Sequence, residues 1–114
     1  MQKDNTMDKV IEGSGNIYAD LDSPDAESML VKAQLATAIA DCIEAHKLTQ
    51  KQAADILGMT QPKLSNLLNG RFRGISEAKM MDCITCLGRD VRIIIGQEHP
   101  SRKRRGKIEI LQEA

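Results

Sequence analysis

Residues 50–70, with the sequence QKQAADILGMTQPKLSNLLNG, decide the fold of this chain. Their pattern predicts two short helices on either side of the turn Gly58-Met59-Thr60. Ala54 stands four residues before Gly58, and its small side chain lets the second helix cross the first closely. Gly58 is free to adopt the positive φ that a tight turn requires. The stretch therefore predicts two crossing helices joined by a short turn.

Capping signals extend this prediction in both directions along the chain. Thr49 with Gln52 three residues later forms a capping box, and Thr60 and Ser76 stand at the starts of two further helices. Ser23 followed by Pro24 is the corresponding signal for a long first helix. The predicted helices, with their caps, cover about residues 24–46, 49–58, 60–70 and 76–88, and the last three end at glycines.

The composition favours helices packed without aromatic side chains. The chain has 114 residues, one Phe, one Tyr and no Trp, so its core is expected to consist of Leu, Ile, Ala and Met. That length suits one domain with short arms. No apolar run approaches the roughly 20 residues that span a bilayer, and no signal peptide is recognisable. We therefore expect an all-α, cytoplasmic protein without membrane contact.

The remaining segments carry weaker signals. Residues 1–16 are predicted to be a flexible leader, and residues 17–21 a short strand or an extended arm. The β-branched run 91–95 is predicted to be a strand that ends the domain 17–95. Because a lone strand is unstable, it needs as partner either residues 17–21 or the same strand of a second subunit. We favour the second subunit, and the side chains expected at this homodimer contact are Val91, Ile93 and Ile95.

Charge is distributed unevenly although the formal net charge is zero. Residues 1–30 carry two lysines against seven acidic side chains, a net charge of −5. Residues 47–73 carry five basic side chains against Asp55, a net charge of +4, and residues 101–107 add five more. The basic middle and the basic tail, residues 96–114, suggest a polyanionic partner, and ordinary solvated faces are the alternative that charge alone does not exclude. The tail itself is open to three interpretations: a solvated tail, an arm along DNA, or a segment that folds on a protein.

The second helix of the central pair has a polar side that its packing does not need. Leu64 and Leu67 supply its apolar contacts, so the other positions are available to a ligand. Amide side chains can pair with adenine and lysine with guanine at the edge of the major groove, and proline can touch a thymine methyl group. The residues predicted to contact bases are Gln61, Pro62, Lys63, Ser65 and Asn66. Lys51, Thr60, Arg71 and Arg73 are predicted to contact phosphates.

At these residues the sequence resembles the Cro/cI-type (XRE) helix-turn-helix family. The small Ala54, the turn Gly58, the apolar Leu64 and Leu67 and the ending Leu68-Asn69-Gly70 occupy that family's positions. The resemblance covers roughly residues 30–88 and implies five packed helices. It also implies that Gln50 touches phosphate and braces Gln61, and that Asn69 and Arg71 contact phosphate. The expected fold is thus an all-α, five-helix Cro/cI repressor-like domain with a C-terminal β-strand and flexible termini.

A wider resemblance covers roughly residues 16–95. The lead-in NIYADLDSPDAESMLVKAQLATAI and the stretch NGRFRGISEAKMMDCITCLGRDVRIII are similar to HigA-like antitoxins of bacterial toxin–antitoxin pairs. That family is implied to dimerise, to bind a palindromic double-stranded DNA operator as a repressor of its own operon, and to neutralise a RelE/HigB-like toxin. The alternatives are a stand-alone repressor without a toxin and a protein-interaction module that does not bind DNA.

Other chemistry has little support. Cys42, His46, Cys83 and Cys86 have one-turn spacings that could present four zinc ligands. Cysteine is also a common small core residue, and the Cys83–Cys86 spacing fits the apolar face of the last helix. The chain has two histidines, and no nucleophile–base pair or pair of carboxylates stands out. We therefore expect no enzyme activity, no catalytic residue, no metal and no cofactor.

Overall fold

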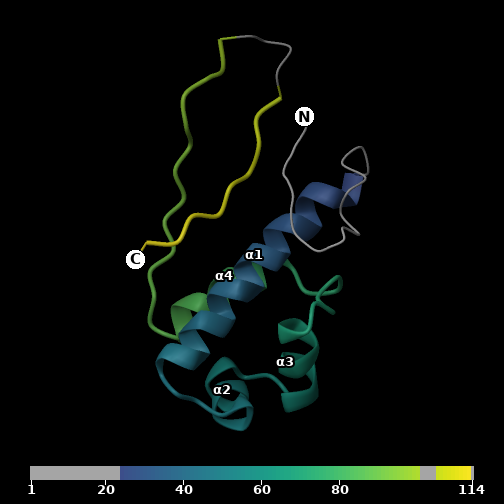
Figure 1. Cartoon of the computed structure of the whole chain (residues 1–114), viewed down its shortest axis with the longest axis vertical. Helices are drawn as coiled ribbons and strands as arrows, with labels where there is room; N and C mark the ends of the chain where they lie inside the picture. The colour runs from purple at the N-terminus through teal and green to yellow at the C-terminus, as the bar shows by residue number, and fades with distance from the viewer. Residues whose placement is uncertain (1–23, 101–104, 114) are drawn as a thin grey trace. The chain divides into compact units, whose positions relative to one another are not determined.

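The computed structural model describes residues 24–100 and 105–113. Four helices follow one another: α1 (Pro24–Ala45), α2 (Gln50–Leu57), α3 (Gln61–Leu68) and α4 (Glu77–Cys86) (Figure 1). The chain divides into two compact units, residues 1–30 and 31–114. Helix α1 begins in the first unit, and α2, α3 and α4 belong to the second.

The predicted caps are confirmed at all three short helices. The Thr49 hydroxyl accepts the Gln52 backbone N–H at 3.1 Å, and the Gln52 side chain accepts the Thr49 N–H at 2.9 Å. Thr60 caps α3 and Ser76 caps α4 in the same way, each accepting the N–H three residues later. These hydrogen bonds satisfy backbone donors that a helix start leaves without partners, so each helix begins where its sequence places it.

The helix ends share one conformation. Gly58, Gly70 and Gly88 adopt positive φ values of 67°, 87° and 97°, a region that costs glycine nothing. At the end of α1 the same region is occupied by Lys47, with φ 55°. In each case the next N–H turns back to a carbonyl in the last turn, as in a Schellman motif. The donor–acceptor pairs are Leu48–Ile43, Met59–Ala54, Arg71–Asn66 and Arg89–Ile84.

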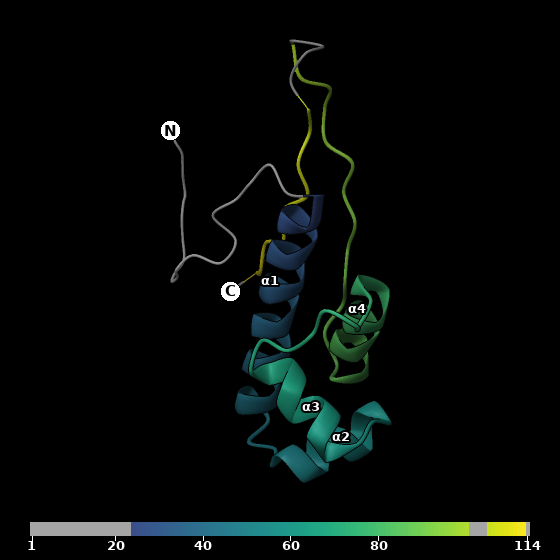
Figure 2. The same cartoon turned by 90° about the vertical axis from the view of Figure 1, so that its right-hand side faces the viewer.

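The core consists mainly of Leu, Ile, Ala and Met side chains, with Phe72 as its aromatic member among the described residues. Ile39, Leu64, Leu67, Met80 and Cys83 are its largest fully buried members. Helix α2 packs against both α3 and α4, and Figures 1 and 2 show α2 and α3 side by side near the C-terminal end of α1. The small Ala53 and Ala54 are buried at this crossing. Packing therefore fixes the angle between α2 and α3 and leaves the far side of α3 outside the core.

Two expectations about the fold are wrong. Within residues 24–100 and 105–113 there are four helices rather than five, and no strand. The fifth helix was an implication of family resemblance, whereas the capping signals in the sequence account for four. The run 91–95 is extended but lies in no hydrogen-bonded ladder, and a β-strand exists only where a neighbour completes that ladder. Of its two predicted partners, residues 17–21 lie outside the described residues, and the other is a second subunit.

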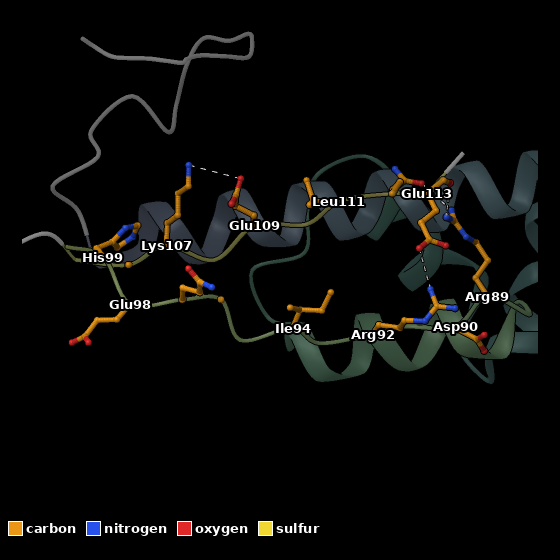
Figure 3. A pocket seen from close by; sticks show the side chains of 14 residues that line it. Arg89, Asp90, Arg92, Ile94, Glu98, His99, Lys107, Glu109, Leu111 and Glu113 are labelled. Carbon is orange, nitrogen blue, oxygen red and sulfur yellow. Dashed lines mark hydrogen bonds and ion pairs between the residues drawn. The ribbon is translucent and has the colours of Figure 1, made fainter. Parts of the chain in front are cut away.

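The chain after α4 forms two extended segments that lie beside each other. An outgoing segment, residues 89–100, leads away from α4, and a returning segment, residues 105–113, runs back alongside it (Figures 1 and 2). Arg89 donates to the Gln112 side chain at 2.9 Å, and Arg92 pairs with Glu113 at 3.1 Å (Figure 3). Side-chain contacts thus join the two segments where a backbone ladder does not. No helix among the described residues is long and apolar enough to cross a membrane.

Candidate nucleic-acid interface

The outer face of α3 carries the residues predicted to contact bases. Leu64 and Leu67, each 0% exposed, anchor the inner face in the core. Of the predicted base contacts, Ser65 is half-buried and the other four are exposed: Gln61, Pro62, Lys63 and Asn66. The core therefore holds α3 by its leucines and leaves amide, lysine and hydroxyl groups on the outside. Such groups match the donors and acceptors at base edges in a major groove.

The residues predicted to contact phosphate are all exposed, although several of them also make hydrogen bonds within the protein. The Thr60 hydroxyl oxygen accepts the Lys63 N–H at 3.2 Å, so its own hydrogen remains able to donate. The Asn69 amide donates to the Ser65 carbonyl at 2.8 Å, which directs this donor back onto α3. The full exposed set is Gln50, Lys51, Thr60, Asn69, Arg71 and Arg73.

Asn66 and Arg71 are brought into direct contact. The Arg71 Nε donates to the Asn66 Oδ1 at 3.0 Å, and the Arg71 backbone N–H donates to the Asn66 carbonyl at 2.8 Å. The positive φ of Gly70 turns the chain back over the last turn of α3 and makes both bonds possible. A residue predicted to contact bases, Asn66, and one predicted to contact phosphate, Arg71, therefore form a hydrogen-bonded pair.

A second expected contact, between Gln50 and Gln61, is not seen. Both side chains are exposed at the starts of their helices, and within the described part of the chain neither hydrogen-bonds to the other. The bracing role that family resemblance implies for Gln50 therefore has no counterpart in this arrangement of side chains.

A lysine that the sequence analysis passed over supports the loop after α3. Lys32 on α1 is 7% exposed, and its Nζ donates to the Arg73 carbonyl at 2.9 Å. The same loop is anchored by the buried Phe72 and Ile75. Lys32 lies three and seven residues before the buried Leu35 and Ile39, and this helical spacing could have revealed its burial. It fixes the loop that carries the two exposed arginines.

The cysteine cluster does not assemble into a metal site among the described residues. Cys42 and Cys83 are buried and Cys86 is exposed, and no group of three or more possible ligand side chains comes together in this part of the chain. His46 Nε2 instead lies 3.2 Å from the Leu87 carbonyl, linking the ends of α1 and α4. Burial raises the pKa of the Cys83 thiol, with Lys79 acting in the opposite direction. That thiol therefore stays protonated to higher pH than an exposed thiol would.

The outgoing segment exposes the residues predicted at a dimer contact. Ile93 and Ile95 are 74% and 88% exposed, while Val91 is half-buried. Ile94 and Leu111 line the opening between the outgoing and returning segments (Figure 3), but Ile93 and Ile95 do not. Side chains alternate along an extended backbone, so the two outer isoleucines project away from the returning segment.

Comparisons with known proteins agree with this geometry. A family described as a helix-turn-helix domain matches residues 17–96. One solved structure, whose name places it in the XRE family of transcriptional regulators, shares 34% sequence identity with the chain. It superposes with a TM-score of 0.71 over 79% of this chain and 100% of its own. The chain belongs to the XRE family of helix-turn-helix transcriptional regulators. No protein with a curated description matches the sequence.

Membership of the XRE family gives the two central helices their names. Helix α2 is the first helix of the motif, the turn at Gly58 joins it to α3, and α3 is the recognition helix. The family is a DNA-binding one, so the exposed face of α3 and the basic residues beside it form its candidate DNA surface.

Proposed function

We propose that the chain is a sequence-specific repressor that inserts α3 into the major groove of double-stranded DNA. The observation that carries this proposal is the division of α3 into a fully buried leucine face and an exposed face of amide and lysine side chains. Lys51, Arg71 and Arg73 stand exposed beside that face and would neutralise phosphates on either side of the groove.

A binding titration tests this proposal. The intact protein is titrated with its own upstream DNA at two salt concentrations, with unrelated DNA as competitor. We expect specific retention that weakens as salt rises, because each neutralised phosphate releases counterions. Absence of specific binding at the lower salt concentration would show that the helix-turn-helix unit serves as a scaffold for protein contacts.

Two variants separate base contacts from phosphate contacts. Asn66→Ala is expected to relax base discrimination at one position of each half-site, by about 1–3 kcal/mol. Lys51→Ala is the matched control, and it should weaken all sequences alike and reduce the dependence of affinity on salt. An unchanged base profile in the Asn66 variant would remove that residue from base recognition.

We propose further that the protein binds a palindromic operator as a homodimer. One recognition helix offers few base contacts, and a two-fold axis doubles them. The outward Ile93 and Ile95, together with Val91, form the apolar face that a second copy would cover. Sedimentation of the double variant Ile93→Ser/Ile95→Ser should show monomers where the parent protein is dimeric. Ile94→Ser, on the other side of the same segment, is the matched control and should leave the dimer intact.

The finer role that we propose is that of an antitoxin which binds a RelE/HigB-like toxin. Its support is the resemblance of residues 16–95 to HigA-like antitoxins. The neighbouring reading frame is expressed alone and together with this chain. Growth arrest by the neighbour alone, relieved by coexpression, is the expected result. A neighbour without effect on growth would favour a stand-alone repressor.

A further inference from the structure

The hydrogen bond between Arg71 and Asn66 has a chemical direction that determines how Asn66 meets DNA. The two atoms in contact are the Arg71 Nε and the Asn66 Oδ1, 3.0 Å apart. An arginine nitrogen can only donate, so the atom that faces it must be the carboxamide oxygen and cannot be the NH₂ group. The contact therefore fixes which end of the amide faces the arginine, a choice that an exposed asparagine otherwise leaves open.

The backbone holds Arg71 in the position that this contact needs. Its N–H is bonded to the Asn66 carbonyl at 2.8 Å, and Gly70 supplies the left-handed turn between α3 and the loop. Phe72, the next residue, is 3% exposed, and the Arg73 carbonyl is tied to Lys32 on α1. Arg71 is thus held from both sides, although its own side chain is exposed.

From this geometry we infer that Arg71 is a positioning residue for base recognition as well as a phosphate contact. This inference rests on the proposed function, DNA binding through α3. With Oδ1 turned to Arg71, the Nδ2 group of Asn66 is the end of the amide that faces away. It meets a base that presents an acceptor in the major groove, as adenine, guanine and thymine do. Cytosine presents only an amino donor there and is disfavoured. The terminal Nη groups of Arg71 remain available for phosphate.

The decisive variant is Arg71→Lys, which keeps the positive charge but has no N–H at the place of Nε. Titrations of Asn66→Ala first identify the operator base pair that Asn66 recognises. The affinity of each variant is then measured for operators carrying each of the four bases at that pair. In Arg71→Lys we expect discrimination against cytosine to fall about threefold to tenfold, while the salt dependence stays that of the parent protein. Arg73→Lys, the same substitution two residues along the same loop, is the matched control: any change in affinity at this phosphate contact should be equal for all four operators, so the relative base preferences stay those of the parent.

The double variant Asn66→Ala/Arg71→Lys completes the cycle. Its base profile should equal that of Asn66→Ala alone, because Arg71 acts on the bases through Asn66. The inference is overturned if Arg71→Lys keeps the parent profile, if the two substitutions act additively, or if Asn66→Ala leaves the profile unchanged. Failure of the parent protein to prefer its operator over unrelated DNA would instead overturn the proposed function, and this is decided before any variant is made.

Discussion

Most isoleucine side chains are buried in the helical body, residues 31–88, whereas those of the outgoing segment that follows it are exposed. Ile39 in the body is 0% exposed, whereas Ile95 in the outgoing segment is 88% exposed. Every short helix of the body has a side-chain cap at its start and a left-handed residue at its end. The outgoing segment contains four β-branched residues, Val91 and Ile93 to Ile95, and none of them lies in a hydrogen-bonded ladder. Local signals therefore account for the body, whereas the isoleucines of the outgoing segment remain exposed among the described residues.

The largest expected change in stability comes from substituting alanine for a buried isoleucine of the helical body, and the same substitution in the outgoing segment tests the contrast. Ile39→Ala removes a fully buried side chain and should lower the free energy of unfolding by about 2–5 kcal/mol. Ile95→Ala, the same substitution at an exposed position, should change it by less than about 0.5 kcal/mol in dilute monomeric protein. Urea denaturation followed by far-ultraviolet circular dichroism measures both, since the chain has no tryptophan. Equal losses would mean that the segment is packed as firmly as the body.

The next effect concerns the one charged side chain in the body's core. Lys32→Ala removes a buried stem and the hydrogen bond to the Arg73 carbonyl, and should cost about 1–3 kcal/mol. Lys51→Ala, at an exposed position of α2, is the control and should be near neutral. Hydrogen exchange should also accelerate in the loop 70–76 of the Lys32 variant. An exchange pattern identical to that of the parent would show that the lysine does not hold this loop.

Substitutions at the ends of two helices are expected to change the free energy of unfolding in opposite directions. Gly58→Ala places a residue with a side chain at φ 67° and should lower the free energy of unfolding by about 1 kcal/mol. An added Cβ would meet no atom within 4 Å. The expected loss is therefore due to the backbone conformation and not to a steric clash. Lys47 adopts the same left-handed conformation at φ 55°. Lys47→Gly removes the side chain that disfavours this conformation and should stabilise the protein by about 0.5 kcal/mol. Thermal unfolding measures both shifts. Destabilisation by Lys47→Gly would indicate that the lysine side chain contributes contacts of its own.

The smallest expected effect lies in the C-terminal segments. Arg92 and Glu113 form an ion pair at 3.1 Å with side chains that are 63% and 81% exposed. Because water and salt screen such pairs, Arg92→Ala should change the free energy of unfolding by less than about 0.5 kcal/mol. Chemical shifts of residues 105–113 should nevertheless move in the variant. Their constancy would mean that Arg92 does not hold the returning segment in solution.

The parts of the fold that sequence could predict are those encoded by neighbouring residues. Thr49, Thr60 and Ser76 start the short helices, and Gly58, Gly70 and Gly88 mark their ends. The strand at 91–95 could not be predicted reliably because strand formation depends on a distant partner as well as on β-branched side chains. The fifth helix failed for a different reason, since it was taken from family resemblance and had no cap of its own.

In the candidate site, too, the features encoded by neighbouring residues could be predicted and those that depend on the folded arrangement could not. The exposed face of α3 could be predicted because Leu64 and Leu67 mark the opposite face by their helical spacing. The bond between Arg71 and Asn66 could not, because it depends on the left-handed turn at Gly70 and on side-chain rotamers. The burial of Lys32 was not predicted either, because a lysine is rarely buried and its partner, the Arg73 carbonyl, is distant in the sequence.

The bond between Asn66 and Arg71 has an evolutionary consequence. If Arg71 orients Asn66, a descendant that acquires a new operator by replacing residue 66 leaves the arginine with nothing to orient. A replacement at residue 71 alone would blur the preference of an unchanged Asn66. We therefore expect the two positions to covary among relatives that recognise different operators. We also expect recently duplicated copies to pass through a promiscuous intermediate, with one of the two residues replaced, before their specificities separate.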